Sequence, residues 1–159
     1  ISLMFLGWSI GGPIIGFLSD KFQRRRMPLM VGSLFGLFIL LIILYVPHLS
    51  FFSVETALFS LGFVISAQII VFAISREVSP EKISGTAIAF TNMLIMLGGL
   101  VFQPVIGWLL DLHWNGTILQ GVPIYSVHDY QIALSILPIG LIISIIFGFF
   151  LRETHASRV

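Results

Sequence analysis

Long apolar runs separated by short polar stretches dominate the pattern of hydrophobic and polar positions along the chain. Five such runs are almost free of charge, and they cover residues 1–18, 27–46, 56–75, 85–110 and 130–151. Apolar runs of about 17–25 residues cross the roughly 30 Å hydrocarbon core of a bilayer as helices. Lipid offers the backbone no hydrogen-bond partners, so each run must satisfy its own backbone groups as a helix. A membrane β-barrel needs period-two alternation instead, which these runs lack. The pattern therefore predicts an all-α, polytopic membrane helix bundle with five transmembrane helices.

The basic residues define an orientation for this bundle. All eight lie between or after the runs. They are Lys21, Arg24, Arg25 and Arg26 in the first loop, Arg76 and Lys82 in the third loop, and Arg152 and Arg158 in the tail. Helices that cross alternately place these three segments on one side, and basic residues are enriched on the cytoplasmic side. We therefore expect a multi-pass protein of the cytoplasmic (inner or plasma) membrane with a cytoplasmic C-terminus.

Composition excludes several classes of function. The chain has no cysteine, which removes disulfides, thiolate catalysis and cysteine-ligated metals. Its net charge is only +1 and its basic residues lie beside the membrane, so we expect no nucleic-acid partner, although these residues also suit anionic lipid headgroups. Residues 7–11 spell G-x-S-x-G, but no strand–turn–helix context or histidine in any run supports a hydrolase. The scattered histidines lack metal-ligand spacing. We therefore expect no enzyme activity, cofactor or metal.

The first loop carries a recognisable motif. Residues 16–25 read GFLSDKFQRR, which resembles the signature G-x-x-x-D-[RK]-x-G-[RK]-[RK] of the major facilitator superfamily. Gln23 stands where the signature prefers glycine, which weakens the prediction of a tight turn and suits the second copy of the motif. The resemblance implies helices eight to twelve of a twelve-helix transporter, with residues 1–159 as its C-terminal part. Because the chain opens inside an apolar run, the missing N-terminal half of the same protein is an expected partner, beside the bilayer and a small-molecule substrate.

Asp20 gives the motif a physical reason. The residue lies just after the apolar run 1–18, at the C-terminal end of the expected helix. The macrodipole disfavours an anion there by a few tenths to about 1 kcal/mol. A neighbouring arginine or the N-terminus of another helix compensates this charge. The resemblance implies that the loop joins the two halves of the transporter on the cytoplasmic side; the alternative is that it only fixes topology. The candidate gating residues are Gly16, Asp20, Lys21, Arg24, Arg25 and Arg26.

Polar residues inside the apolar runs are candidates for lining a solute pathway, because polar groups facing lipid are disfavoured. Asn92 and Gln103 share a stripe of the fourth run with Met96 and Gly99, and Gln68 lies in the third run. The second and fifth runs look peripheral. The alternative role for Gln68, Asn92 and Gln103 is simple hydrogen bonding between helices. No titratable side chain lies near the middle of any run, so this part of the chain offers no group for proton coupling.

Three local features refine the predicted helices. Gly12 and Gly16 lie four residues apart on one face, which predicts a close approach of another helix. Ser79 and Pro80 predict a helix start, with a break or surface turn near Gly85. The ending Phe150–Thr154, an apolar run followed by R-E-T, resembles the end of the last helix of the family.

The predicted function is transport of a small hydrophilic solute by alternating access, in which two helical halves rock around a site at the midplane. A secondary active transporter such as a symporter, or a facilitator, both fit. Candidate solutes include an organic acid, an amino acid, a sugar derivative or an exported drug. A non-transporting sensor or scaffold built on the same helices, or an inactive truncated product, remains the alternative. A membrane enzyme lacks support, since no nucleophile, base or metal set faces a cavity.

Overall fold

The computed structural model describes residues 2–114, 116–119 and 121–154. Arg158, counted above among the basic residues of the tail, lies outside these ranges. In the described part of the chain, five helical segments are long and apolar enough to cross a membrane. They are Ser2–Phe22, Arg26–Tyr45, Phe51–Glu77, Glu81–Leu112 and Val127–Phe150. The predicted all-α bundle of five membrane-length helices is confirmed.

The elements follow one another as α1 (Ser2–Phe22), α2 (Arg26–Tyr45), α3 (Phe51–Ile65), the 3₁₀ turn η1 (Ser66–Ile69), α4 (Ile70–Glu77), the 3₁₀ turn η2 (Glu81–Ile83), α5 (Ser84–Leu112), β1 (Ile118–Leu119), β2 (Val122–Pro123), α6 (Val127–Leu134) and α7 (Ile136–Phe150). The first and third segments extend beyond the predicted apolar runs, to Phe22 and from Phe51. Hydropathy marks the depth of the hydrocarbon core, whereas a helix continues as long as its backbone groups find partners.

Two of the predicted single helices are divided. Ser66, whose hydroxyl donates to the carbonyl oxygen of Phe63 at 2.6 Å, begins the tighter turn η1 between α3 and α4. The last membrane-length segment contains a similar junction, because α6 and α7 meet at Ser135. Pro138 follows this junction and has no N–H to donate to the carbonyl of Leu134, so the regular hydrogen-bond ladder is interrupted there.

The segment before α5 combines a correct prediction with an error. The exposed 3₁₀ turn η2 provides the surface turn that was predicted near Gly85. The predicted cap at Ser79 was wrong, since Pro80 precedes η2 and no side chain caps it. From Ser84 the helix continues without a break to Leu112.

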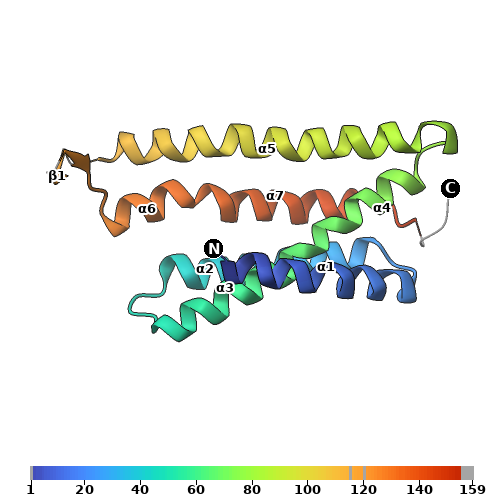
Figure 1. Cartoon of the computed structure of the whole chain (residues 1–159), viewed down its shortest axis with the longest axis horizontal. Coiled ribbons are helices and arrows are strands. Elements are labelled where there is room, and N and C mark those ends of the chain that lie inside the picture. Colours follow the sequence, from blue (N-terminus) through green and yellow to red (C-terminus); the bar gives the residue numbers. More distant parts are fainter. Residues whose placement is uncertain (1, 115, 120, 155–159) are drawn as a thin grey trace.

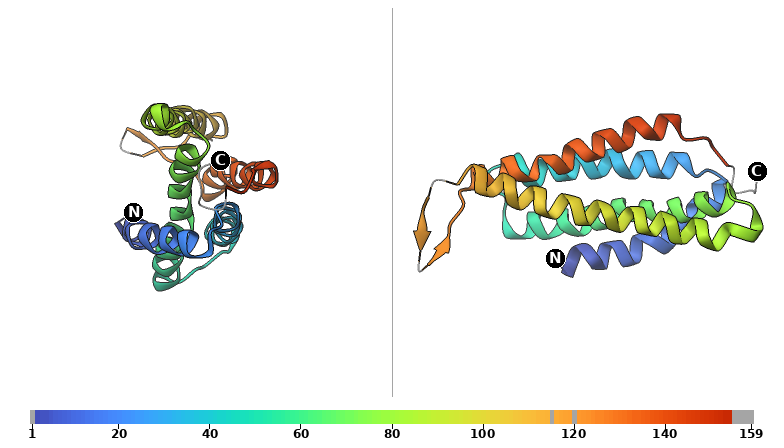
Figure 2. Two further views of the ribbon diagram at one scale, coloured as in Figure 1. Left: turned by 90° about the vertical axis from the view of Figure 1, so that its right-hand side faces the viewer. Right: turned by 90° about the horizontal axis from the view of Figure 1, so that it is seen from above.

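The helices lie lengthwise beside one another, and α4 crosses obliquely between two groups (Figure 1). On one side of α4, α1 packs on α3, and α2 contacts both α3 and α7. On the other side lies α5, which contacts α4 and α6. The end of α1, the start of α2, the end of α4 and the end of α7 all lie on the right in Figure 1, and Figure 2 shows the same arrangement from above. We call this the basic end. The β1–β2 hairpin extends from the opposite end.

Glycines allow the closest helix contact, between α1 and α3. A Cβ atom at Gly7 would overlap the carbonyl oxygen of Phe59, and one at Gly62 would overlap that of Met4. The prediction had placed the close approach at Gly12 and Gly16. A Cβ at Gly16 would meet nothing within 4 Å, so that residue makes no close contact. The rotation of α1 on α3 therefore presents the face that carries Gly7.

Candidate functional site

The loop between α1 and α2 forms a tight turn although it lacks glycine. Gln23 has a φ of 49°, in the left-handed region. The backbone N–H of Gln23 donates to the carbonyl of Asp20 at 3.2 Å, and that of Arg24 donates to the carbonyl of Ser19 at 3.1 Å. These two bonds form a Schellman motif, which usually has glycine at this left-handed position. The expectation that Gln23 weakens the tight turn was therefore wrong, because glutamine adopts the conformation that the signature glycine favours.

This turn places Arg25 at the centre of a buried cluster of polar side chains. Its Nη1 donates to the Asp20 carboxylate at 2.6 Å and to the Ser19 hydroxyl at 3.0 Å. Its Nη2 donates to the Glu77 carboxylate at 2.5 Å, and its Nε donates to the same group at 3.0 Å. The side chain of Arg25 is only 8% exposed and that of Glu77 only 10%. One guanidinium therefore joins the end of α1 to the end of α4.

The segment after α7 completes the cluster. The Thr154 hydroxyl donates to the second oxygen of Glu77 at 2.5 Å, and Thr154 itself is buried. Hydrogen bonding to Glu77 raises the pKa of the Arg25 guanidinium above its ordinary value and outweighs the lowering caused by burial. Arg25 therefore stays cationic. No buried side-chain nitrogen or oxygen in the described part of the chain lacks a hydrogen-bond partner, as a stable buried network requires.

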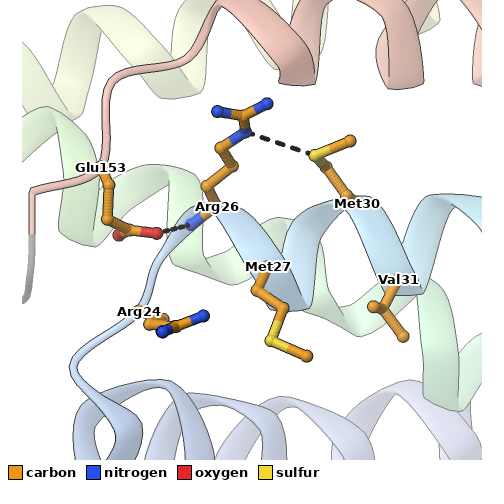
Figure 3. Close-up of a pocket in the computed structure, with 6 residues that line it drawn as sticks. All are labelled: Arg24, Arg26, Met27, Met30, Val31 and Glu153. Carbon is orange, nitrogen blue, oxygen red and sulfur yellow. Dashed lines mark hydrogen bonds between the residues drawn. The ribbon is translucent and has the colours of Figure 1, made fainter.

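A carboxylate from the other end of the sequence caps α2. Glu153 accepts from the backbone N–H of Arg25 at 2.6 Å and from that of Arg26 at 3.2 Å, and Figure 3 shows the second bond. The residue at the N-cap, Arg25, provides no side-chain cap of its own. The unpaired N–H groups and positive dipole at a helix N-terminus favour an anion. Glu153 therefore fixes the end of α7 against the start of α2. We call Ser19, Asp20, Arg25, Glu77, Glu153 and Thr154 the Arg25 cluster.

The structure separates the predicted gating residues into two groups. It brings Asp20 and Arg25 together, which is one of the pairings that the argument from the helix dipole had left open. Lys21 and Arg24 are exposed. Arg26 lies over the ring of Phe149, 5.6 Å from its centre. Gly16, as noted above, makes no close contact.

Sequence reasoning missed the other members of the cluster. Ser19, Glu77, Glu153 and Thr154 were not among the candidates. One signal was available, because Glu77 and Glu153 fall in the same predicted loop and tail as the basic residues. A carboxylate at the end of an apolar run needs a partner, and the first loop offers an excess of cations.

The three candidate pathway residues lie in different surroundings. Gln68 lies in η1 and lines a cavity of about 160 Å³ together with residues of α2 and α7, including Ser33 and Ser144. Asn92 and Gln103 lie exposed on α5, a helix with no buried residue. A polar contact joins α4 to α5 nearby, where the Thr91 hydroxyl donates to that of Ser75 at 2.9 Å.

Comparison with known proteins identifies the group to which this bundle belongs. The profile of the Major Facilitator Superfamily matches residues 1–159. The chain belongs to the major facilitator superfamily. Members of this superfamily are transporters rather than enzymes, so the chain is part of a multi-pass membrane protein of a transport family. No solved structure matches the chain significantly.

A curated relative of this major facilitator chain is an uncharacterized MFS-type transporter, YfiU, of Bacillus subtilis (strain 168). The two are 30% identical over 118 residues, which cover 72% of this chain. The same alignment covers 22% of the relative, so the chain spans about a fifth of the length of the protein that it matches.

Proposed function

We propose that this chain is helices eight to twelve of a twelve-helix major facilitator transporter, and that the whole protein moves a small solute across the cytoplasmic membrane by alternating access. The basic end faces the cytoplasm in this proposal, since alternate crossing puts every basic loop on that side. Membership of the superfamily and the match of the first loop to its signature support the assignment. A symporter and a facilitator both remain consistent with it.

The observation that carries the proposal is the Arg25 cluster. Arg25 and Glu77 are buried, and their hydrogen bonds to each other, to Asp20 and to Thr154 form only while the ends of α1, α4 and α7 lie together. Removing one partner from a buried ion pair costs about 3–5 kcal/mol, so separating these ends is expensive unless water or another partner replaces the contact. Such a cluster favours one discrete arrangement over another, as a two-state transporter needs. We assign it to the outward-facing state, in which the cytoplasmic side is closed.

Gln68, Asn92 and Gln103 are proposed to face the solute pathway. The exposure of α5 supports this role, because a helix without buried residues has a face for a further part of the protein or for water. An exposed amide on a membrane-length helix is disfavoured against lipid. Asn92 and Gln103 therefore fit a polar cavity between the two halves.

The test uses the full-length protein with any native cysteines replaced; residues 1–159 contribute none. A single cysteine at Gln103 reports access from the outside through its labelling by a membrane-impermeant maleimide. We expect Arg25→Gln to reduce this labelling several-fold, because the protein leaves the outward-facing state. Arg76→Gln is the matched control, since it removes one positive charge from an exposed residue next to Glu77.

Flux measurements test the transport claim separately. Proteoliposomes with the full-length protein are assayed for uptake of succinate, alanine, glucose and ethidium, one probe for each candidate solute class. Uptake of one probe above that of empty liposomes, changed several-fold by Arg25→Gln but not by Arg76→Gln, supports the proposal. If solute uptake is measurable but Arg25→Gln does not change it, the loop between α1 and α2 only fixes the topology of the protein. Altered labelling without flux of any probe would favour a sensor.

A further inference from the structure

Two arginines of the first loop stand outside the Arg25 cluster and flank a surface hollow. Figure 3 shows Arg24 and Arg26 on two sides of Met27, at the start of α2. The hollow measures about 380 Å³ and is completed by Met30, Val31 and Glu153. Arg24 is exposed, so its guanidinium is accessible from the surface. The hollow therefore presents two cations at the mouth of an apolar surface.

The guanidinium of Arg26 contacts a thioether and an aromatic ring, and these contacts leave most of its N–H donors for a ligand. In the described part of the chain, its guanidinium makes one hydrogen bond, from Nε to the sulfur of Met30 at 3.4 Å. A thioether is a weak acceptor. A guanidinium has five N–H donors in a planar fork that matches the oxygens of a phosphate. The contact with Phe149 orients the group without using these donors.

The charge of the hollow favours an anion. Its lining includes one carboxylate, Glu153, against the two arginines. Both oxygens of Glu153 already accept backbone N–H groups of α2, which partly compensate its charge. Lys21, in the last turn of α1, adds a further exposed cation.

An apolar groove continues from the hollow along the membrane-spanning part of α2. Met27 and Val31 line both, and the groove, of about 290 Å³, extends past them to Phe35. All of its lining residues are apolar, and they come from α1, α2 and α3. From Met27 to Phe35 the helix rises about 12 Å at 1.5 Å per residue. The groove thus leads from the arginines toward the interior of a bilayer.

We propose that this composite surface binds one anionic glycerophospholipid. The phosphate lies between Arg24 and Arg26, and an acyl chain lies in the groove along Met27, Val31 and Phe35. The arrangement matches the two parts of such a lipid, an anion at the interface and a hydrocarbon chain that enters the membrane. A water-soluble phosphate would use the arginines but not the groove, and a soluble protein would not reach the part of the groove within the membrane.

Native mass spectrometry of the full-length protein tests the proposal. The protein is released from nanodiscs that contain equal amounts of phosphatidylglycerol and phosphatidylcholine, and the retained lipids are counted. A basic residue near an anionic membrane surface contributes about 1 kcal/mol, which corresponds to about five-fold in affinity. We expect Arg24→Gln and Arg26→Gln each to reduce the retained phosphatidylglycerol about five-fold relative to phosphatidylcholine. Lys82→Gln, which removes an exposed cation from the same end, should leave the ratio unchanged.

A second pair of measurements separates the lipid from a soluble anion. Val31→Trp fills the groove and leaves both arginines in place, so it should lower phosphatidylglycerol retention. Millimolar inorganic phosphate should not displace the lipid. Displacement by phosphate, an undiminished signal in Val31→Trp, or an equal loss in Lys82→Gln would each overturn the proposal. Because none of these readouts depends on transport, failure here would leave the proposed transport function untouched.

Discussion

The turns that flank α2 each contain a residue in the left-handed conformation, but they are tied to the rest of the molecule to very different degrees. Gln23 before the helix and His48 after it both have positive φ, at 49° and 58°. Before the helix, Arg25 reaches residues 52 positions away and its backbone reaches residues 128 positions away. At the other end, Gln131 donates one hydrogen bond to the carbonyl of Leu44 in the last turn of the helix, and in the loop that follows Ser50 contacts Ser53, three positions along. The comparison separates a turn that only reverses the chain from a turn that also assembles a buried network.

Removing the central cation should produce the largest effect. Arg25→Gln leaves the buried carboxylate of Glu77 without its ion pair, which should cost about 3–5 kcal/mol of stability. Thermal unfolding of the full-length protein in detergent, followed by circular dichroism, measures the loss. Arg25→Lys should recover only part of it, because an ammonium cannot reproduce the planar contacts to Asp20 and Glu77. A loss no larger than that of Arg76→Gln would mean that the cluster contributes no stability.

Truncating the cap at the opposite end should have a smaller and more local effect. The Ser50 hydroxyl accepts from the backbone N–H of Ser53 at 3.2 Å, at an exposed site. Ser50→Ala should therefore cost about 1 kcal/mol, the usual cost of losing an N-cap. Hydrogen exchange should rise in the first turn of α3 and stay unchanged around Arg25. Faster exchange at the basic end as well would show that the two ends of α2 are coupled.

Glycine substitutions compare the two turns directly. A left-handed conformation costs a non-glycine residue about 1–2 kcal/mol, and a substitution by glycine removes this cost. Part of the gain in stability is lost again, because glycine has more conformational freedom in the unfolded chain. Gln23→Gly and His48→Gly should each stabilise the protein by about 0.5–1 kcal/mol, measured as an increase in Tm. Equal increases would confirm that the turns are locally equivalent. A decrease for Gln23→Gly alone would show that the glutamine side chain has a role in the cluster.

The sequence predicted the membrane-length segments because their signal is local. A run such as residues 27–46 carries the information in its own composition, whatever it packs against. The ends of the helices were less predictable. Ser135 divides the last segment because Pro138 interrupts the ladder of backbone hydrogen bonds. Hydropathy averaged along the chain does not detect such an interruption.

The sequence predicted only the local half of the candidate site. Asp20 and Arg25 lie five positions apart in a motif, and the helix dipole gave a reason for their pairing. Glu77 and Thr154 join them only because α4 and the end of α7 meet at the basic end. The glycine contact was missed for the same reason, since the face that α1 presents to α3 depends on packing. Contacts between distant residues require the fold.

Asp20→Asn should change stability least and so isolates the exposed edge of the cluster. The Asp20 side chain is 67% exposed, in contrast to the buried Glu77. An exposed ion pair contributes about 0–1 kcal/mol. Removing an anion from the C-terminal end of a helix recovers some of that amount. The Tm should therefore shift by less than in any variant above. If Asp20 acts in the conformational change, however, labelling of the cysteine at position 103 should still shift in the same direction as in Arg25→Gln. Unchanged labelling together with an unchanged Tm would limit the functional cluster to its buried members, and the motif aspartate would then serve only to end α1.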